Sequence, residues 1–202
     1  MSPSTRIAST AGWLDEALGV VRGGGVVALP FERLFGLAAD AFNSEAVARI
    51  DEIKRRSSWS QPVAVIVPDW EALSRVAIEF PQLAADLAEE HWPGPLTLIV
   101  PGGDDMPEQL RSEAGLIGVR IPGPSPALDL ARAGDTVLTA TSANLTGGPD
   151  ALSHEDVRDL AGVDLIVPGR VPGPPGSTVV DATGTKPIVV RAGAIEIEGL
   201  LP

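Results

Sequence analysis

The sequence of 202 residues predicts one α/β domain built on a mixed sheet. Short apolar runs typical of buried strands alternate with segments whose apolar residues recur at helical spacing. Hydrophobic residues make up 44% of the chain, so there is enough apolar material for a packed core. The 22 glycines and 19 prolines lie between these segments as turns, and no linker or repeat divides residues 1–202.

The first 54 residues predict a helix, a strand and a second helix. Residues 11–22 (AGWLDEALGVVR) carry apolar side chains at helical spacing and end at three consecutive glycines. Residues 26–29 have the composition of a buried strand, which stops at Pro30. Ser44 is expected to cap a helix that continues to Lys54, because the apolar residues of this segment fall on one helical face.

The middle and the end of the chain predict further strands. Residues 63–67 form a second buried strand, and Pro68-Asp69 opens a short helix. Pro81 starts another helix, which ends near Trp92. The remaining strands are expected at residues 96–100, 117–121, 137–140, 165–167, 178–180 and 188–190.

Two more helices and one coil complete the prediction. Residues 126–133 form one helix, and Ser153 is expected to cap another that runs to residue 160 with acidic side chains in its first turn. The coil of residues 168–176 (PGRVPGPPG) is expected to be the most mobile segment.

Composition argues against several classes of protein. The net charge of −12 opposes non-specific binding to nucleic acid, which needs a basic surface for phosphate contacts. A local basic cleft is still compatible with this charge, because salt screens interactions beyond roughly 8 Å. No apolar stretch approaches the roughly 20 residues of a membrane span, the N-terminus lacks the hydrophobic segment of a secretory signal, and there is no cysteine. We therefore expect a cytoplasmic protein that does not span a membrane.

Common phosphate and catalytic motifs are absent, but basic residues recur at the ends of predicted elements. The sequence contains no GxxxxGK[ST], GxGxxG, HExxH or GxSxG motif. Two predicted strands lead to Arg120 and Arg191, and the helix that follows Ser44 ends in Lys54, Arg55 and Arg56. Taken singly, each cation is better explained as a solvated strand end or a helix C-terminus. Together they predict a polyanion site, to which Thr141, Ser142 and Asn144 would add neutral donors.

Seven segments occur in the order found in the YrdC-like family, which includes the threonylcarbamoyl-AMP synthases. The resemblance extends from about Gly24 to Ile195, nearly the whole chain, and WPGPLTL, TSAN and STVVD are its most specific parts. The segments are PFERLFGLAADAF (30–42), IKRR (53–56), HWPGPLTLIVP (91–101), GVRIP (118–122), ATSANLTG (140–147), STVVD (177–181) and VVRAGAI (189–195).

This resemblance implies a single YrdC-like domain with a twisted sheet, flanked by helices, around a deep cleft. Enzymes of the family use L-threonine, bicarbonate and ATP, and release threonylcarbamoyl-AMP and pyrophosphate. A partner complex then transfers the threonylcarbamoyl group to an adenosine of certain tRNAs. Mg²⁺ would be held largely by the triphosphate, and adenylation needs fixed cations and positioning without a covalent nucleophile. No catalytic side chain and no protein ligand to a metal are therefore expected.

The resemblance also implies residue roles. Lys54 and Arg56 match the K-x-R pair of the family, Ser142 and Asn144 match its S-x-N pair, Arg191 matches its ATP-side arginine and Arg120 its amino-acid-side arginine. The implied ATP-binding set is Lys54, Arg56, Ser142, Asn144 and Arg191, and the implied substrate-binding set is Phe31, Glu32, Arg33, Arg120 and Thr141.

The chain departs from the family at two places near the amino-acid half of the cleft. Where relatives read P-T-E-T-V-Y-G, this sequence has Phe31 and Arg33 in place of the threonines and Phe35 in place of the tyrosine, while Glu32 and Gly36 are kept. Glu32 is expected to pair with Arg33. In addition, SSWSQP (57–62) replaces the usual residues after the K-x-R pair.

Three functions are compatible with these departures. The first is an active threonylcarbamoyl-AMP synthase with a modified pocket. The second is the same adenylate chemistry on another substrate, for which Arg33 suggests a more acidic amino acid. The third is a catalytically weak paralogue that binds nucleotide or double-stranded RNA, although the acidic net charge disfavours RNA.

Overall fold

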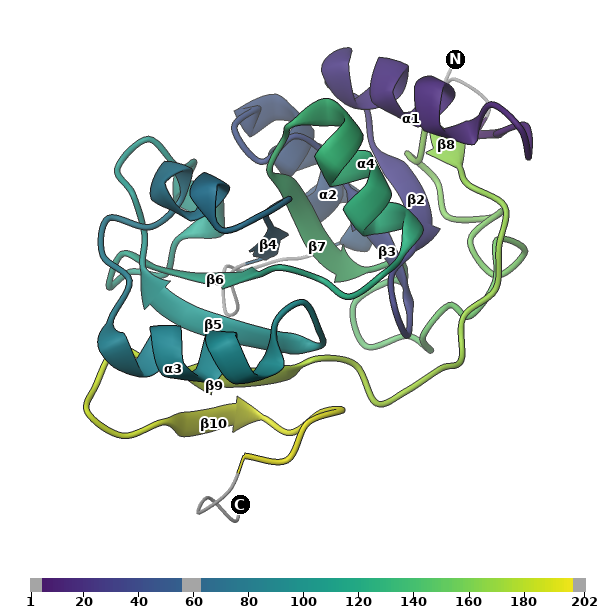
Figure 1. Cartoon of the computed structure of the whole chain (residues 1–202). Helices are drawn as coiled ribbons and strands as arrows, with labels where there is room; N and C mark the ends of the chain where they lie inside the picture. The colour runs from purple at the N-terminus through teal and green to yellow at the C-terminus, as the bar shows by residue number, and fades with distance from the viewer. Residues whose placement is uncertain (1–4, 56–62, 198–202) are drawn as a thin grey trace.

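The computed structural model describes residues 5–55 and 63–197, and in this part of the chain ten strands form one mixed sheet (Figure 1). The strand order is β1-β8-β2-β3-β7-β4-β6-β5-β9-β10, with both parallel and antiparallel neighbours. The strands are β1 (Arg6–Ile7), β2 (Val27–Pro30), β3 (Phe35–Ala38), β4 (Ala64–Ile66), β5 (Leu96–Pro101), β6 (Leu116–Arg120), β7 (Leu138–Ser142), β8 (Leu165–Ile166), β9 (Thr178–Asp181) and β10 (Ile188–Arg191).

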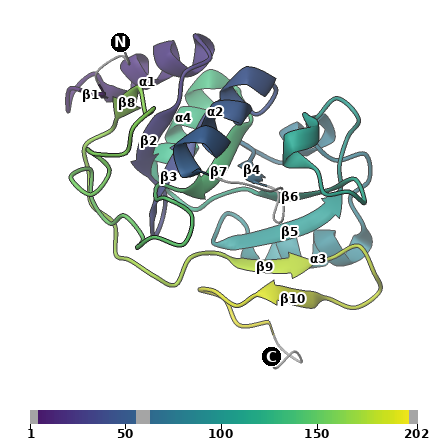
Figure 2. The same cartoon turned by 180° about the vertical axis from the view of Figure 1, so that it is seen from behind.

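Four α-helices cover the sheet in the described part of the chain. Helices α1 (Trp13–Arg22) and α4 (Pro126–Gly134) pack together on one face, and α2 (Ser44–Lys54) lies on the opposite face (Figures 1 and 2). Helix α3 (Gln82–His91) packs against β5. Short 3₁₀ helices span Glu71–Arg75 and Glu108–Leu110. No helix among the described residues has the length and apolar character that crossing a bilayer requires.

Strand β2 shows why both faces of the sheet carry helices. Its side chains point alternately to the two faces of the sheet. Val27 and Leu29 pack in a hydrophobic cluster with residues of α1 and α4, and Ala28 packs in a second hydrophobic cluster with Ile50 of α2. All four residues of β2 are buried, which explains its continuous apolar sequence. Each large apolar side chain buried in this way stabilises the fold by roughly 1.5–3 kcal/mol. The two layers thereby fix the position of the end of α2 relative to the strands.

The sequence-based strands are confirmed, with bounds that differ by at most two residues. Strands β1 and β3 were not expected. Strand β3 completes an antiparallel pair with β2, and Gly36 lies opposite Leu29 in that pair. The cap of α2 also differs, because Asn43 and not Ser44 accepts the N–H groups of Glu45 and Ala46.

The predicted helix at residues 153–160 is wrong, because this segment forms turns. The Asp156 carboxylate accepts the backbone N–H groups of Leu152 and Ser153 and the Ser153 hydroxyl. Ser153 also forms an isolated bridge with Arg170. The polar side chains that resembled a helix start therefore close a local turn against the coil that precedes β9.

Candidate functional site

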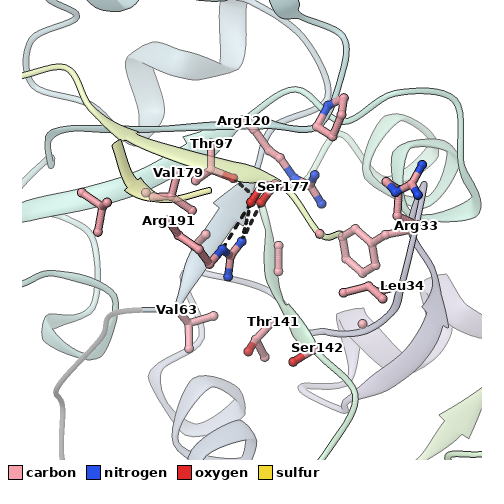
Figure 3. A pocket seen from close by; sticks show the side chains of 18 of the residues that line it. Arg33, Leu34, Val63, Thr97, Arg120, Thr141, Ser142, Ser177, Val179 and Arg191 are labelled. Carbon is pink, nitrogen blue, oxygen red and sulfur yellow. Dashed lines mark hydrogen bonds between the residues drawn. The ribbon is translucent and has the colours of Figure 1, made fainter. Parts of the chain in front are cut away.

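A cleft of about 830 Å³ opens between the two halves of the sheet. It is lined by residues of β3, the end of α2, β5, β6 and β7, and by β9 and β10 from the C-terminal part of the chain. Figure 3 shows Arg191 and Ser177 on one side of the cleft, with Thr141 and Ser142 on the other. Segments far apart in the sequence thus meet around one open space.

Lys54 joins the end of α2 to the turn that follows β7. The residue is only 3% exposed, and Nζ donates to Ser142 O at 2.6 Å, Asn144 O at 3.0 Å and Asn144 Oδ1 at 3.0 Å. The Ser142 hydroxyl donates to Asn144 Oδ1 at 2.7 Å, and Asn144 Nδ2 donates to Gly148 O at 2.8 Å. The hydroxyl of Thr146 donates to Lys54 O at 2.9 Å and so satisfies one of the carbonyls that have no intrahelical partner at the end of α2. This network holds the Ser-Ala-Asn turn at the cleft wall.

Arg191, at the end of β10, is held by Ser177. Its Nε and Nη2 atoms donate to Ser177 O at 3.2 and 2.9 Å, and Nη2 also donates to Ser177 Oγ at 2.9 Å (Figure 3). The Thr97 hydroxyl donates to Ser177 Oγ from β5. A Cβ atom at Gly193 would lie 2.4 Å from Ser177 C, so only glycine permits this close approach. Although Arg191 as a residue is exposed, partial desolvation of its guanidinium lowers its pKa, and the charge of Asp150 acts in the opposite direction.

Arg120, at the end of β6, is buried in an ion pair. Both terminal nitrogens of its guanidinium contact the Glu32 carboxylate, with Nη2 3.3 Å from Oε2 and Nη1 3.4 Å from Oε1. Glu32 Oε1 also accepts the backbone N–H of Gly123 at 2.7 Å. The guanidinium carbon lies 5.6 Å from the centroid of the Phe31 ring, a cation–π distance. This ring packs directly on Gly36, where a Cβ atom would lie 2.2 Å from Phe31 Cε2.

The expected ion pair between Glu32 and Arg33 is wrong. Glu32 turns to Arg120, while Arg33 Nε donates to Pro175 O at 2.8 Å and Arg33 Nη2 donates to Pro174 O at 3.2 Å. Both residues lie in the bend between β2 and β3, which the bond from Phe31 N to Leu34 O closes, and in this bend the two adjacent opposite charges bind different partners. Figure 3 shows the Arg33 guanidinium apart from that of Arg120, at the edge of the cleft.

The cleft has the electrostatics of an anion site. Burial is the main cause that lowers the pKa of Arg120; Glu32 raises this pKa, and the nearby positive charge of Arg191 lowers it further. A bound anion would offset both the burial of these guanidiniums and their mutual repulsion. Among the described residues, no group of three or more His, Cys, Asp or Glu side chains is placed to hold a metal ion.

Most of the residues that the sequence singled out lie together. Of the expected ATP-binding set, Lys54, Ser142, Asn144 and Arg191 line the cleft, and Arg56 lies outside the described residues, as does SSWSQP. All of the expected substrate-binding set also line it, namely Phe31, Glu32, Arg33, Arg120 and Thr141.

Sequence reasoning missed three cleft residues. Thr97 and Ser177 form the support of Arg191, and Asp150 lies close enough to influence the pKa of that arginine. Ser177 opens the STVVD segment, so its position in a quoted motif was the available signal. Thr97 had the same signal, because it lies in the quoted WPGPLTL segment. Asp150 had none, because it lies in no quoted motif and acts on a residue distant in the sequence.

The mixed sheet with its helices defines an α/β protein, whose cleft is lined by cations at strand ends and by a Ser-Ala-Asn turn. The chain belongs to the Sua5/YciO/YrdC family, whose model, described as "Telomere recombination", matches residues 19–193. It is homologous to threonylcarbamoyl-AMP synthases. It is 35% identical to that of Pyrococcus abyssi over 90% of this chain and 54% of the relative, and 32% identical to a putative one of Mycobacterium tuberculosis over 90% and 84%. The chain thus spans about half the length of the Pyrococcus protein.

Solved structures agree with this relationship. The structure of P. abyssi Sua5 complexed with L-threonine has a TM-score of 0.84 at 32% identity, covering 96% of this chain and 58% of that one. The structure of YciO from E. coli has a TM-score of 0.85 at 27% identity, and both chains are covered fully. The α/β fold with a cleft, expected from the motif resemblance, is therefore confirmed.

Proposed function

We propose that this protein is a threonylcarbamoyl-AMP synthase that uses ATP, bicarbonate and L-threonine. The observation that carries the proposal is the convergence of Lys54, Ser142, Asn144 and Arg191 on one cleft in a chain homologous to such synthases. The amine of threonine and bicarbonate combine to a carbamate with loss of water. A carbamate oxygen then forms a bond to the α-phosphorus of ATP, and the bond from this phosphorus to pyrophosphate breaks.

The cleft residues would act by position and charge. Arg191 and the Ser-Ala-Asn turn, which Lys54 holds in place, would bind the triphosphate and stabilise the charge that develops on pyrophosphate. Arg56 belongs to the same proposed set through the K-x-R motif. Mg²⁺ would arrive on the triphosphate, since the described residues offer no carboxylate cluster.

The amino acid would occupy the part of the cleft bordered by Phe31, Glu32, Arg120 and Thr141. The Pyrococcus relative has been solved in complex with L-threonine, which supports the same substrate here. Arg120 would face the carboxylate of the amino acid while Glu32 keeps its guanidinium in place. The phenyl ring of Phe31 supports a second candidate, the same chemistry on a different amino acid, because it removes a hydroxyl that a threonine side chain could bond.

The decisive experiment is a pyrophosphate-release assay with MgATP, bicarbonate and each of the twenty amino acids in turn. Threonine-dependent release that requires bicarbonate is the expected result. Release with a different amino acid would instead establish the second candidate. No release with any of them, together with retained ATP binding, would leave the protein as a nucleotide-binding paralogue and refute both enzymatic functions.

Two further partners are proposed from the same relationship. Because threonylcarbamoyl-AMP is an activated mixed anhydride that water destroys, an enzyme that transfers the threonylcarbamoyl group must consume it. A tRNA-modifying transferase complex would fill that role. Double-stranded RNA is the less favoured partner, because the net charge of −12 opposes contacts with a polyphosphate outside the cleft.

A further inference from the structure

The coil between β8 and β9 contains two consecutive prolines at the edge of the cleft. Pro174 and Pro175 have no N–H groups, so their backbone can form hydrogen bonds only as an acceptor, through the carbonyl oxygens. Arg33 supplies donors to both, with Nε on Pro175 O at 2.8 Å and Nη2 on Pro174 O at 3.2 Å. The backbone strengthens the same junction, since Gly173 N donates to Arg33 O at 2.9 Å.

The anchored stretch leads directly to the support of Arg191. Only Gly176 separates Pro175 from Ser177, whose carbonyl and hydroxyl both bind the Arg191 guanidinium. Gly176 O accepts the N–H of Ala194, so the far side of the stretch is tied to the segment after β10. A shift of the two prolines would therefore move the acceptors that orient Arg191.

We propose that Arg33 is a positioning residue for the nucleotide half of the cleft, acting through the Pro174 and Pro175 carbonyls, Ser177 and Arg191. The inference rests on the proposed function only in taking the nucleotide to be ATP. The proposal thereby gives a role to Arg33, which departs from the family motif and which the sequence analysis assigned to the amino-acid pocket. A guanidinium suits this role because its rigid planar fork presents N–H donors on two different nitrogens, one to each of two neighbouring carbonyls.

The test compares Arg33→Thr, Arg33→Lys and the control Arg170→Thr. Arg170 lies in the same coil and is exposed, and it does not line the cleft, so the control removes the same charge without touching this network. We expect Arg33→Thr to raise the Kd of MgATP about tenfold, the equivalent of one hydrogen bond to a charged group. Arg33→Lys should recover part of the loss, and Arg170→Thr should bind like the wild type. The KM for the amino acid should change less than twofold in all three.

Amide hydrogen exchange supplies a readout without nucleotide. The N–H of Ala194 reports its bond to Gly176 O, and its protection should fall in Arg33→Thr and stay unchanged in Arg170→Thr. An unchanged Kd for MgATP in Arg33→Thr would overturn the proposal, as would a rise confined to the KM of the amino acid. If the wild type failed to bind MgATP, the proposed function would be refuted. In that case, faster exchange at Ala194 in Arg33→Thr would still support the role of Arg33 in positioning the coil. Unchanged exchange would refute that role.

Discussion

Replacing Lys54 by methionine should destabilise the fold, because its buried ammonium holds α2 to the turn after β7. Methionine keeps the length of the side chain but removes all three donors, leaving Ser142 O, Asn144 O and Asn144 Oδ1 without this partner. Hydrogen bonds to a charged group are worth about 1.5–3 kcal/mol each, but they are not additive, and methionine avoids burying a charge. We therefore expect a loss of about 3 kcal/mol in the free energy of unfolding.

Urea denaturation of wild type and variant measures this loss, and thermal unfolding should show a decrease in Tm of about 6–12 °C. The matched control is Lys186→Met, which changes the same residue type at an exposed site and should stay within about 0.5 kcal/mol of the wild type. If Lys54→Met cost no more than Lys186→Met with the same dependence on urea, the network around Lys54 would not stabilise the fold and the reasoning would be refuted.

Three other predictions concern the cleft and the turn at Asp156. Phe31→Thr should raise kcat/KM for threonine about tenfold by restoring one hydrogen bond, measured by pyrophosphate release, and a decrease would mean that the ring itself binds the substrate. Saturation with MgATP at a hundredfold excess over Kd should stabilise the wild type by about 2.7 kcal/mol, and Arg191→Ala or Arg56→Ala should lose most of that thermal shift; equal shifts would contradict their role. Hydrogen bonds from Leu152 and Ser153 lower the pKa of Asp156, so their contribution is present above the unfolded-state pKa of about 3.9 and is lost as pH falls through the lower folded-state pKa. Asp156→Asn should flatten the acid limb of the stability curve, and an unaltered limb would show that the turn does not contribute.

Several cleft residues could be predicted from the sequence because they are the last residues of strands, and the end of an apolar run marks where a strand stops. Strand β6 ends on Arg120, β10 ends on Arg191, and β7 ends on Ser142, so the cations and the Ser-Ala-Asn turn followed from where each apolar run stops. The family motifs then grouped these residues into one expected site, and the structure places Arg120, Arg191 and Ser142 around a common cleft.

Contacts between distant segments could not be read in the same way. Glu32 is 88 residues away from Arg120, and Arg33 reaches residues more than 140 positions later, so nothing local indicates either partner. Strand β3 was missed because Gly36 weakens the strand signal of FGLA, although that glycine is what allows the Phe31 ring to pack on the backbone.

The distribution of charge within the cleft explains how a protein with a net charge of −12 could bind both ATP and a zwitterionic amino acid. On the amino-acid side, Glu32 offsets the charge of Arg120. On the opposite side, Arg191 bonds the neutral oxygens of Ser177, and no carboxylate among the described residues forms a salt bridge with it. A triphosphate would therefore meet a guanidinium that the charge of Asp150 influences but that no described carboxylate binds in a salt bridge, while a substrate without net charge would meet a balanced ion pair. Because salt screens charges beyond roughly 8 Å, this local asymmetry outweighs the acidic surface over the distance of a bound ligand.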